Sequence, residues 1–251
     1  MCLLSFAWQP DSEAQLTLVS NRDEFHKRPT APSSFWEPEH PNLLAGKDLE
    51  AGGTWMGVTR DGRFAALTNV RQIPAPYQGT ISRGNLVKDY LISDQSPESF
   101  LNSIQGQDYD GFNLIVGHRT QCWYLGNRPL DSQPQKLGPG IYGLSNAQLN
   151  TPWPKTQLAK QALAQWIETD ERASSSLHQL LNSTEKFEAS LLPNTGIGEP
   201  WETLLSSPFI ISPEYGTRAC TSLQIQSNTI HWKEATMNEK GEQTHIIEHS
   251  F

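Results

Sequence analysis

Short apolar segments bounded by turn residues occur near both ends of this sequence, and they constrain its fold more than any other feature. Near the start of the chain, one pair flanks Pro10-Asp11 and a second pair flanks Asp61-Gly62. Pro and Asp favour tight turns, and Asp-Gly tolerates the positive φ angle that a short hairpin loop requires. Each pair therefore predicts an antiparallel hairpin. The expected strands are residues 2–8, 15–20, 54–60 and 63–70.

The middle of the chain has helical periodicity instead. An apolar face recurs along residues 154–169, and Ser96-Pro97 is typical of a helix start. Residues 29–42 contain four prolines and are expected to form a loop. Further strands are expected at residues 112–118, 121–125, 209–211, 219–226, 229–235 and 243–249. The pattern favours an α+β fold in one domain spanning residues 1–251, with antiparallel sheets and helices packed outside them.

Charge and cysteine content narrow the classes of function. The 19 Lys and Arg against 27 Asp and Glu give a formal net charge of −8, which argues against a nucleic-acid-binding surface. The apolar start ends at Pro10, and no stretch reaches the roughly 20 apolar residues of a spanning helix, so we expect neither a signal peptide nor integral membrane association. The cysteines and histidines show no metal-binding spacing, so no metal is expected. The few, scattered cysteines favour a reducing compartment, most simply the cytoplasm.

Cys2 is the first candidate for chemistry because of its position. Removal of Met1 would leave an α-amine and a thiol on one residue. The ordinary pKa values of these groups, about 8 and about 8.5, let the amine accept the thiol proton near neutral pH. Nucleophile and base would then come from the same residue. The alternative is that Cys2 is an ordinary buried cysteine of the first strand.

The polar segment Asn21-Arg22-Asp23 favours the first interpretation. A hairpin returns the end of its second strand to the start of its first, so this segment is expected beside Cys2. Asp23 would hold the ammonium form of the terminal amine, and Arg22 would hold the thiolate or a substrate carboxylate. The alternative is a solvated charge cluster at a strand end. Asn21, Arg22 and Trp55 are the candidate substrate-binding residues, although an aromatic residue in a strand more often belongs to the core.

Six motifs in a fixed order resemble those of the NRDE family, also called the Transport and Golgi organisation protein 2 family. They are Met1-Cys2-Leu3-Leu4, Asn21-Arg22-Asp23-Glu24, Gly52-Gly53-Thr54-Trp55, Ala66-Leu67-Thr68-Asn69, Tyr142-Gly143-Leu144-Ser145-Asn146 and Tyr215-Gly216-Thr217-Arg218. The family is distantly similar to N-terminal nucleophile hydrolases of choloylglycine hydrolase and penicillin V acylase type. That similarity implies a four-layer αββα sandwich.

The resemblance also implies roles for individual residues. Cys2 would attack a linear amide, Asp23 would orient the free amine, Asn69 and Asn146 would form the oxyanion site, and Arg218 would assist. One departure concerns Arg22, because the hydrolases place their early Arg three residues before the Asp. Here Arg22 immediately precedes Asp23 and is expected on the opposite face of the strand. A structural role for Arg22 therefore stays open beside a binding role.

Two functions follow from these observations. The first is an N-terminal cysteine amidohydrolase that acts on a linear non-peptide amide and needs no cofactor. The second is a carrier, since the family resemblance also implies roles in haem trafficking and in handling lipids or acyl-coenzyme A. In a carrier, the aromatic residues would cover a flat apolar ligand and Arg22, Arg28 or Arg218 would meet its anionic groups. Cys2 or His26 would contact haem iron, although no local haem motif supports either.

Overall fold

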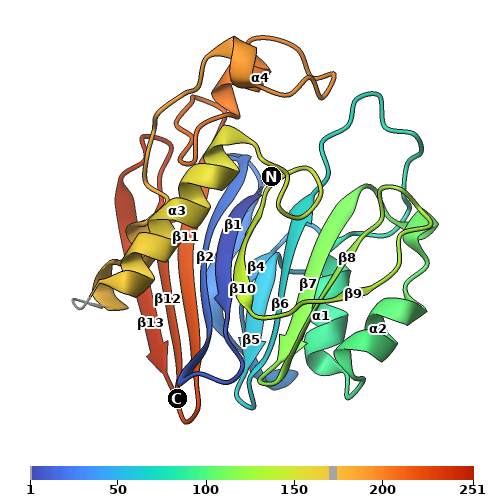
Figure 1. Cartoon of the computed structure of the whole chain (residues 1–251), viewed down its shortest axis with the longest axis vertical. Coiled ribbons are helices and arrows are strands. Elements are labelled where there is room, and N and C mark those ends of the chain that lie inside the picture. Colours follow the sequence, from blue (N-terminus) through green and yellow to red (C-terminus); the bar gives the residue numbers. More distant parts are fainter. Residues whose placement is uncertain (1, 170–173) are drawn as a thin grey trace.

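Two antiparallel sheets form the centre of the molecule, and the computed structural model describes residues 2–169 and 174–251 (Figure 1). The first sheet has the strand order β10-β1-β2-β11-β12-β13. These strands are β1 (Cys2–Trp8), β2 (Ala14–Phe25), β10 (Gly140–Leu144), β11 (Tyr215–Gln226), β12 (Ile230–Met237) and β13 (Gln243–Ser250). The second sheet runs from β3 to β9 in chain order. Its strands are β3 (Thr30–Trp36), β4 (His40–Asp48), β5 (Met56–Thr59), β6 (Arg63–Asn69), β7 (Phe112–His118), β8 (Gln121–Gly126) and β9 (Gln135–Lys136).

Helices cover the outer faces of both sheets. Helix α3 packs on the first sheet, while α1 and α2 pack on the second (Figure 1). The helices are α1 (Gly84–Ile92), α2 (Pro97–Ser103), α3 (Pro154–Glu168) and α4 (Trp201–Leu204), with 3₁₀ turns at Gly106–Asp108, Ser174–Gln179 and Ala189–Leu191. The layers therefore follow the order α-β-β-α, which confirms the predicted α+β sandwich.

Strand alternation produces three apolar layers between these elements. In β1, Leu4, Phe6 and Trp8 enter the core between the two sheets, because successive side chains point to opposite faces. The residues between them, Leu3 and Ala7, pack against α3 instead. A third cluster fills the space between the second sheet and helices α1 and α2. The central strands of both sheets are thus buried on both faces.

Residues 29–42 form most of a strand pair, so the predicted loop is wrong. Strands β3 and β4 pair antiparallel there, and β3 is the edge strand of its sheet. An edge strand tolerates proline because one row of its backbone groups needs no partner. Pro32 falls within a register shift between Ala31 and Ser34, where the ladder is already interrupted. The strand predicted at residues 209–211 is also wrong, because these residues are irregular and anchor the start of β11 through Thr217.

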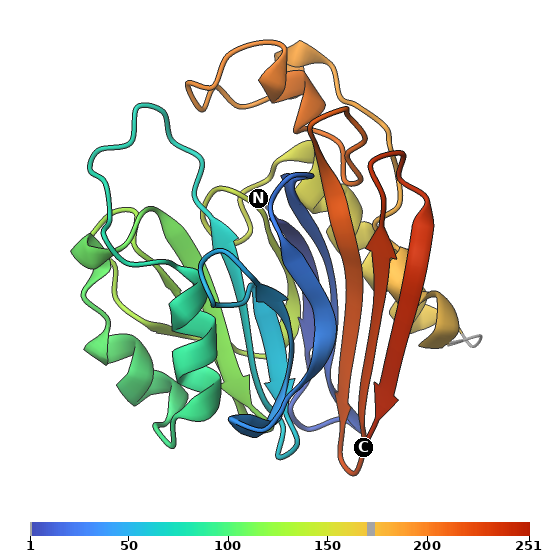
Figure 2. The same ribbon diagram turned by 180° about the vertical axis from the view of Figure 1, so that it is seen from behind.

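Several segments that are distant in the sequence meet at one end of the molecule. The start of β1 lies at the end of the molecule where α4 projects (Figure 1). The view from behind shows the segment between β6 and α1 projecting at the same end (Figure 2). Across residues 2–169 and 174–251, the structure contains no helix with the length and hydropathy required to cross a membrane. The start of β1 and the ends of β2 and β6 therefore share one open end of the sandwich.

Candidate active site

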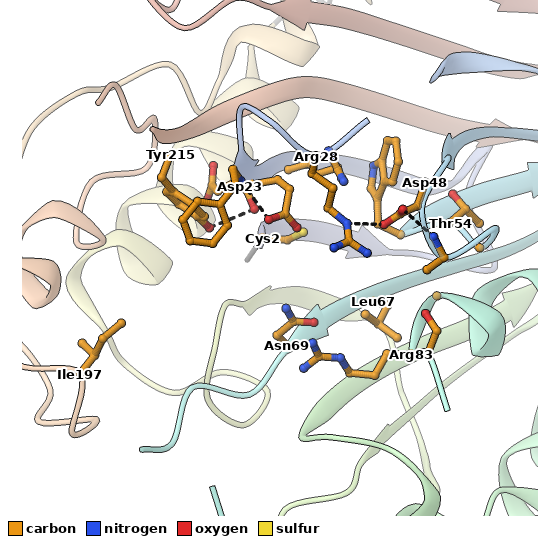
Figure 3. Close-up of a pocket in the computed structure, with 18 of the residues that line it drawn as sticks. Cys2, Asp23, Arg28, Asp48, Thr54, Leu67, Asn69, Arg83, Ile197 and Tyr215 are labelled. Atoms are coloured by element: carbon orange, nitrogen blue, oxygen red, sulfur yellow. Dashed lines mark hydrogen bonds and ion pairs between the residues drawn. The ribbon is translucent and has the colours of Figure 1, made fainter. Parts of the chain in front are cut away.

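A cavity of about 580 Å³ opens where the two sheets separate, and Cys2 lines it (Figure 3). One wall carries Cys2 from β1 and residues 22–25 from β2, and the other carries Asn69 from β6 and Arg83 from the start of α1. Ligand pockets of small-molecule enzymes and carriers commonly have volumes of about 300–1,000 Å³. The cavity is thus large enough for a small organic ligand.

The β1–β2 hairpin sets the position of Cys2. Cys2 pairs directly with Arg22 across the ladder, so the two side chains emerge on the same face. Cys2 is only 8% exposed, yet its side chain belongs to the cavity wall. Burial raises the pKa of the Cys2 thiol, although the charge of Arg22 opposes that shift. The thiol is therefore mainly protonated at neutral pH and needs a nearby base to become a nucleophile.

Asp23 lies on the other side of β2 and reaches the same end of the cavity. Its Oδ1 atom accepts a hydrogen bond of 2.7 Å from the Thr217 hydroxyl, and the Tyr215 hydroxyl donates to its backbone oxygen at 3.0 Å. Burial raises the pKa of Asp23 to about 6, while the charge of Lys155 opposes the shift. Burial has the opposite effect on the Lys155 ammonium and lowers its pKa to about 8, while the charge of Asp23 opposes that change. The carboxylate of Asp23 and the ammonium of Lys155 therefore stabilise each other's charged form.

The raised pKa of Asp23 predicts a measurable dependence of stability on pH. The fold favours the neutral carboxyl, so this contribution to stability is complete below about pH 4 and is lost as pH rises through about 6. The difference between 3.8 and about 6 corresponds to about 3 kcal/mol. The stability of Asp23→Asn relative to the unsubstituted chain should therefore increase when the pH is raised from 4 to 8. Urea unfolding at pH 4 and at pH 8 measures this change, with the exposed Asp11→Asn as control. The same change in unfolding free energy with pH in all three proteins would contradict the expectation.

Asn69 and Asn146 have different positions relative to the cavity. Asn69 ends β6 and lines the cavity opposite Cys2 (Figure 3). Asn146 is fully buried, and its side-chain amide donates to the backbone oxygen of Asn69 at 2.9 Å. The preceding Ser145 hydroxyl reaches the Cys2 backbone oxygen at 3.5 Å. Asn146 thus fixes the backbone at Asn69 and does not line the cavity, so of the two asparagines only Asn69 is part of the cavity wall.

Arg218 and Asn21 lie outside the cavity. The pairing of β11 with β2 shifts register between Thr217 and Ala219, so Arg218 occupies a bulge that redirects its side chain. Its Nη1 atom donates to the backbone oxygens of Phe25 and His26 at 3.0 and 3.1 Å. The buried Asn21 amide donates to the backbone oxygens of Leu181 and Pro208 at 2.8 and 2.9 Å. Both residues hold loops in place around the site, and the roles predicted for them from the sequence have no support from this placement.

Arg22, Trp55 and Arg83 line the cavity together. The guanidinium of Arg22 stacks on Trp55, with its central carbon 4.3 Å from the ring centroid. Arg22 and Asp23 point to opposite faces of β2 as expected, and both nevertheless reach the cavity because it surrounds the strand end. Arg83 lies at the end of the β6–α1 connection, directly before α1. The sequence did not predict it as a site residue, because its only local feature is its place before a helix start. The buried Lys155 was missed because it sits within an ordinary helical pattern.

The family model described as Transport and Golgi organisation 2 matches residues 1–239. The chain belongs to this family. The human Transport and Golgi organization protein 2 homolog is 34% identical over 268 residues, with 96% of this chain and 94% of that protein covered. The Drosophila melanogaster family member is 30% identical, with 94% of this chain and 92% of that protein covered. The similarity therefore covers nearly the full length of this chain and of each of these two relatives.

Two solved structures align with most of this chain at low similarity. The mutant C2A conjugated bile acid hydrolase from Clostridium perfringens aligns over 99% of this chain and 96% of its own, with a TM-score of 0.47 and 8% identity. The Caenorhabditis elegans N-acylethanolamine-hydrolyzing acid amidase ortholog aligns over 78% and 95%, with a TM-score of 0.40 and 11% identity. These values are too low to transfer an activity to this family member.

Proposed function

We propose that this family member is an N-terminal cysteine hydrolase that cleaves a linear non-peptide amide. The observation that carries the proposal is the position of Cys2, whose side chain lines a cavity between Asp23 and Asn69. A thiol enclosed only by hydrocarbon would have no access to a substrate. Here the cavity gives a small molecule access to Cys2, and polar groups lie on either side of it.

The chemistry requires removal of Met1, so that Cys2 carries a free α-amine. That amine would accept the thiol proton, and the sulfur would attack the amide carbonyl carbon. The Asn69 side chain would donate a hydrogen bond to the oxyanion, and the C–N bond would break as the ammonium returns its proton to the leaving amine. Water would then hydrolyse the thioester, with the same amine as base. Asp23 would stabilise the ammonium form of that amine.

Intact-mass measurement combined with thiol labelling tests this proposal. We expect the purified chain to begin at Cys2 and to react with iodoacetamide at this residue. Cys122 and Cys220 serve as internal controls, because burial strongly raises the pKa of both thiols. A protein that keeps Met1, or that is labelled at Cys2 no faster than at Cys122, would contradict the proposed maturation. We also propose a reducing compartment such as the cytoplasm, since all three cysteines are free thiols.

A carrier of haem, lipid or acyl-coenzyme A is the second candidate, and the mixed lining of the cavity favours it. Phe25, Trp55 and Trp201 offer apolar surface, while Arg22 and Arg83 offer cations. Of the two residues predicted to contact haem iron, only Cys2 lines the cavity, because the His26 ring bonds to the Ser212 backbone oxygen at 2.9 Å. A haem titration tests this candidate: a Soret shift abolished by Cys2→Ala supports it, and an absent shift contradicts haem binding.

A further inference from the structure

The guanidinium of Arg22 is a buried cation that forms no direct ion pair within the described part of the chain. The residue is 5% exposed and stacks on Trp55, and its charge acts at longer range on the carboxyls of Asp23 and Glu234. No carboxylate of the described residues forms an ion pair with it, and its buried Nη1 atom has no hydrogen-bond partner there. A buried charge without a counterion is energetically costly. An anion that enters the cavity would remove that cost.

A second cation, Arg83, lines the same cavity. One of its N–H groups donates to the Gly111 backbone oxygen at 3.1 Å, and it forms no ion pair within residues 2–169 and 174–251. Figure 3 shows Arg83 beside Asn69 on the wall that faces Cys2. Guanidinium groups bind carboxylates and phosphates through several N–H donors at once, so each arginine can bind such a group.

Close backbone contact places Arg83 near Trp55 and hence near Arg22. The Thr54 amide donates to the Gly84 backbone oxygen at 3.2 Å. A Cβ atom at Gly53 would lie 2.5 Å from the Gly84 carbonyl carbon, so glycine permits this approach. The segment that leads into Trp55 therefore touches the start of α1, immediately after Arg83. The two arginines are thus held by rigid elements on opposite walls of one cavity.

The other charged groups of the cavity interact with neighbouring residues. Arg28 is neutralised by Asp48 at 2.7 Å and by Glu50 at 3.1 Å. Asp23 is held by Thr217. The half-buried Glu24 accepts a hydrogen bond from the Phe25 amide at 2.9 Å, and its negative charge acts on Arg28 and Arg83. Among the described residues that line the cavity, the arginines without an ion pair are therefore Arg22 and Arg83. Apolar side chains complete the cavity wall next to them.

We propose that Arg22 and Arg83 form an anion-binding subsite that holds a carboxylate or phosphate group of the ligand next to Cys2. The ligand class is an amphiphile with one anionic group and an apolar body that contacts Trp55, Leu67 and Ile197. This inference rests on the cavity of the proposed function but requires only binding, so the two can fail separately. Anion binding without hydrolysis contradicts the hydrolase proposal alone, and hydrolysis without anion preference contradicts the subsite alone.

Calorimetric titration of the Cys2→Ala chain tests the subsite without turnover. The probes are dodecanoate, dodecyl phosphate and neutral dodecanamide, each below its micelle concentration. We expect both anions, or one of them, to bind at least about 10-fold more tightly than the amide, since charge-assisted hydrogen bonds exceed neutral ones. A preference between the two anions would identify the group as carboxylate or phosphate. Equal affinity for the anions and the amide, or no binding of any probe, would overturn the proposal.

Substitutions assign the effect to the two arginines. Arg22→Gln and Arg83→Gln, each added to Cys2→Ala, should weaken anion binding about 10-fold and leave amide binding unchanged. Arg60→Gln is the matched control, because it removes the same charge from an exposed position that does not line the cavity. An equal loss of affinity in the Arg60 variant would show a general charge effect and overturn the assignment.

The ligand-free protein gives an independent readout. Because the Arg22 charge is buried without a direct ion pair, Arg22→Met should unfold at the same temperature as the unsubstituted chain or at a higher one. A large fall in the melting temperature would show that Arg22 mainly stabilises the fold and would overturn the proposal.

Discussion

Replacement of Cys2 by alanine is expected to abolish amide cleavage, with a loss of at least about 1,000-fold in kcat. The reason is that the cavity offers no other thiol: Cys122 and Cys220 are fully buried and do not line it. Without the sulfur, only substrate binding and the Asn69 donor would remain. Release of amine from a panel of N-acyl amides that carry a carboxylate or phosphate measures the effect.

The matched control for this substitution is Cys220→Ala. Cys220 packs with Phe209, Ala235 and Met237 on the far side of β11, away from the cavity. This variant should keep the activity of the unsubstituted chain. Full activity in Cys2→Ala, or no cleavage of any amide by the unsubstituted chain, would contradict the hydrolase proposal and leave the carrier.

Arg71→Met is expected to destabilise the fold by about 3–5 kcal/mol, because it leaves the Glu202 carboxylate buried without its cation. Arg71 Nη2 lies 2.9 Å from Glu202 Oε2, and the two side chains are 4% and 7% exposed. The Glu202 Oε1 atom also accepts hydrogen bonds from the Thr195 amide and hydroxyl at 2.7 and 2.6 Å. This pair joins the segment after β6 to α4, which carries Trp201 over the cavity.

Urea unfolding of single and double variants checks this expectation. Arg71→Met/Glu202→Gln should recover most of the lost stability, because the amide keeps an acceptor for Thr195 and removes the uncompensated charge. Loosening of α4 should also raise the KM of any substrate with little change in kcat. A loss below about 1 kcal/mol in the single variant, or no recovery in the double variant, would contradict a stabilising role for the pair.

Local sequence patterns predicted much of the fold correctly. The turn at Asp61-Gly62 joins β5 and β6, with Gly62 at a φ of 94°. Helix α2 begins after Ser96, whose side chain accepts from the Ser99 amide. These features depend on neighbouring residues, which the sequence displays directly. The strand β3 was missed for the opposite reason, since its prolines are compatible with a strand only at the edge of a sheet.

The same distinction applies to the site. The proximity of Cys2 to Arg22 and Asp23 followed from one hairpin, because a short turn fixes which residues face each other. The environment of Arg218 did not follow, because a bulge in β11 decides its direction. Asn146 likewise supports Asn69 from within the structure, and only the contact between the ends of β6 and β10 shows this.

By itself, the sequence determined the strand pattern, the hairpin that places Asp23 near Cys2, and the family motifs, because these properties lie in short stretches of chain. Only the tertiary structure decided that Arg83 and Lys155 belong to the surroundings of the site and that Arg22 is a buried cation whose Nη1 atom has no hydrogen-bond partner among the described residues. Burial and electrostatic partners depend on which distant segments meet, and the packing of the two sheets and their helices brings those segments together.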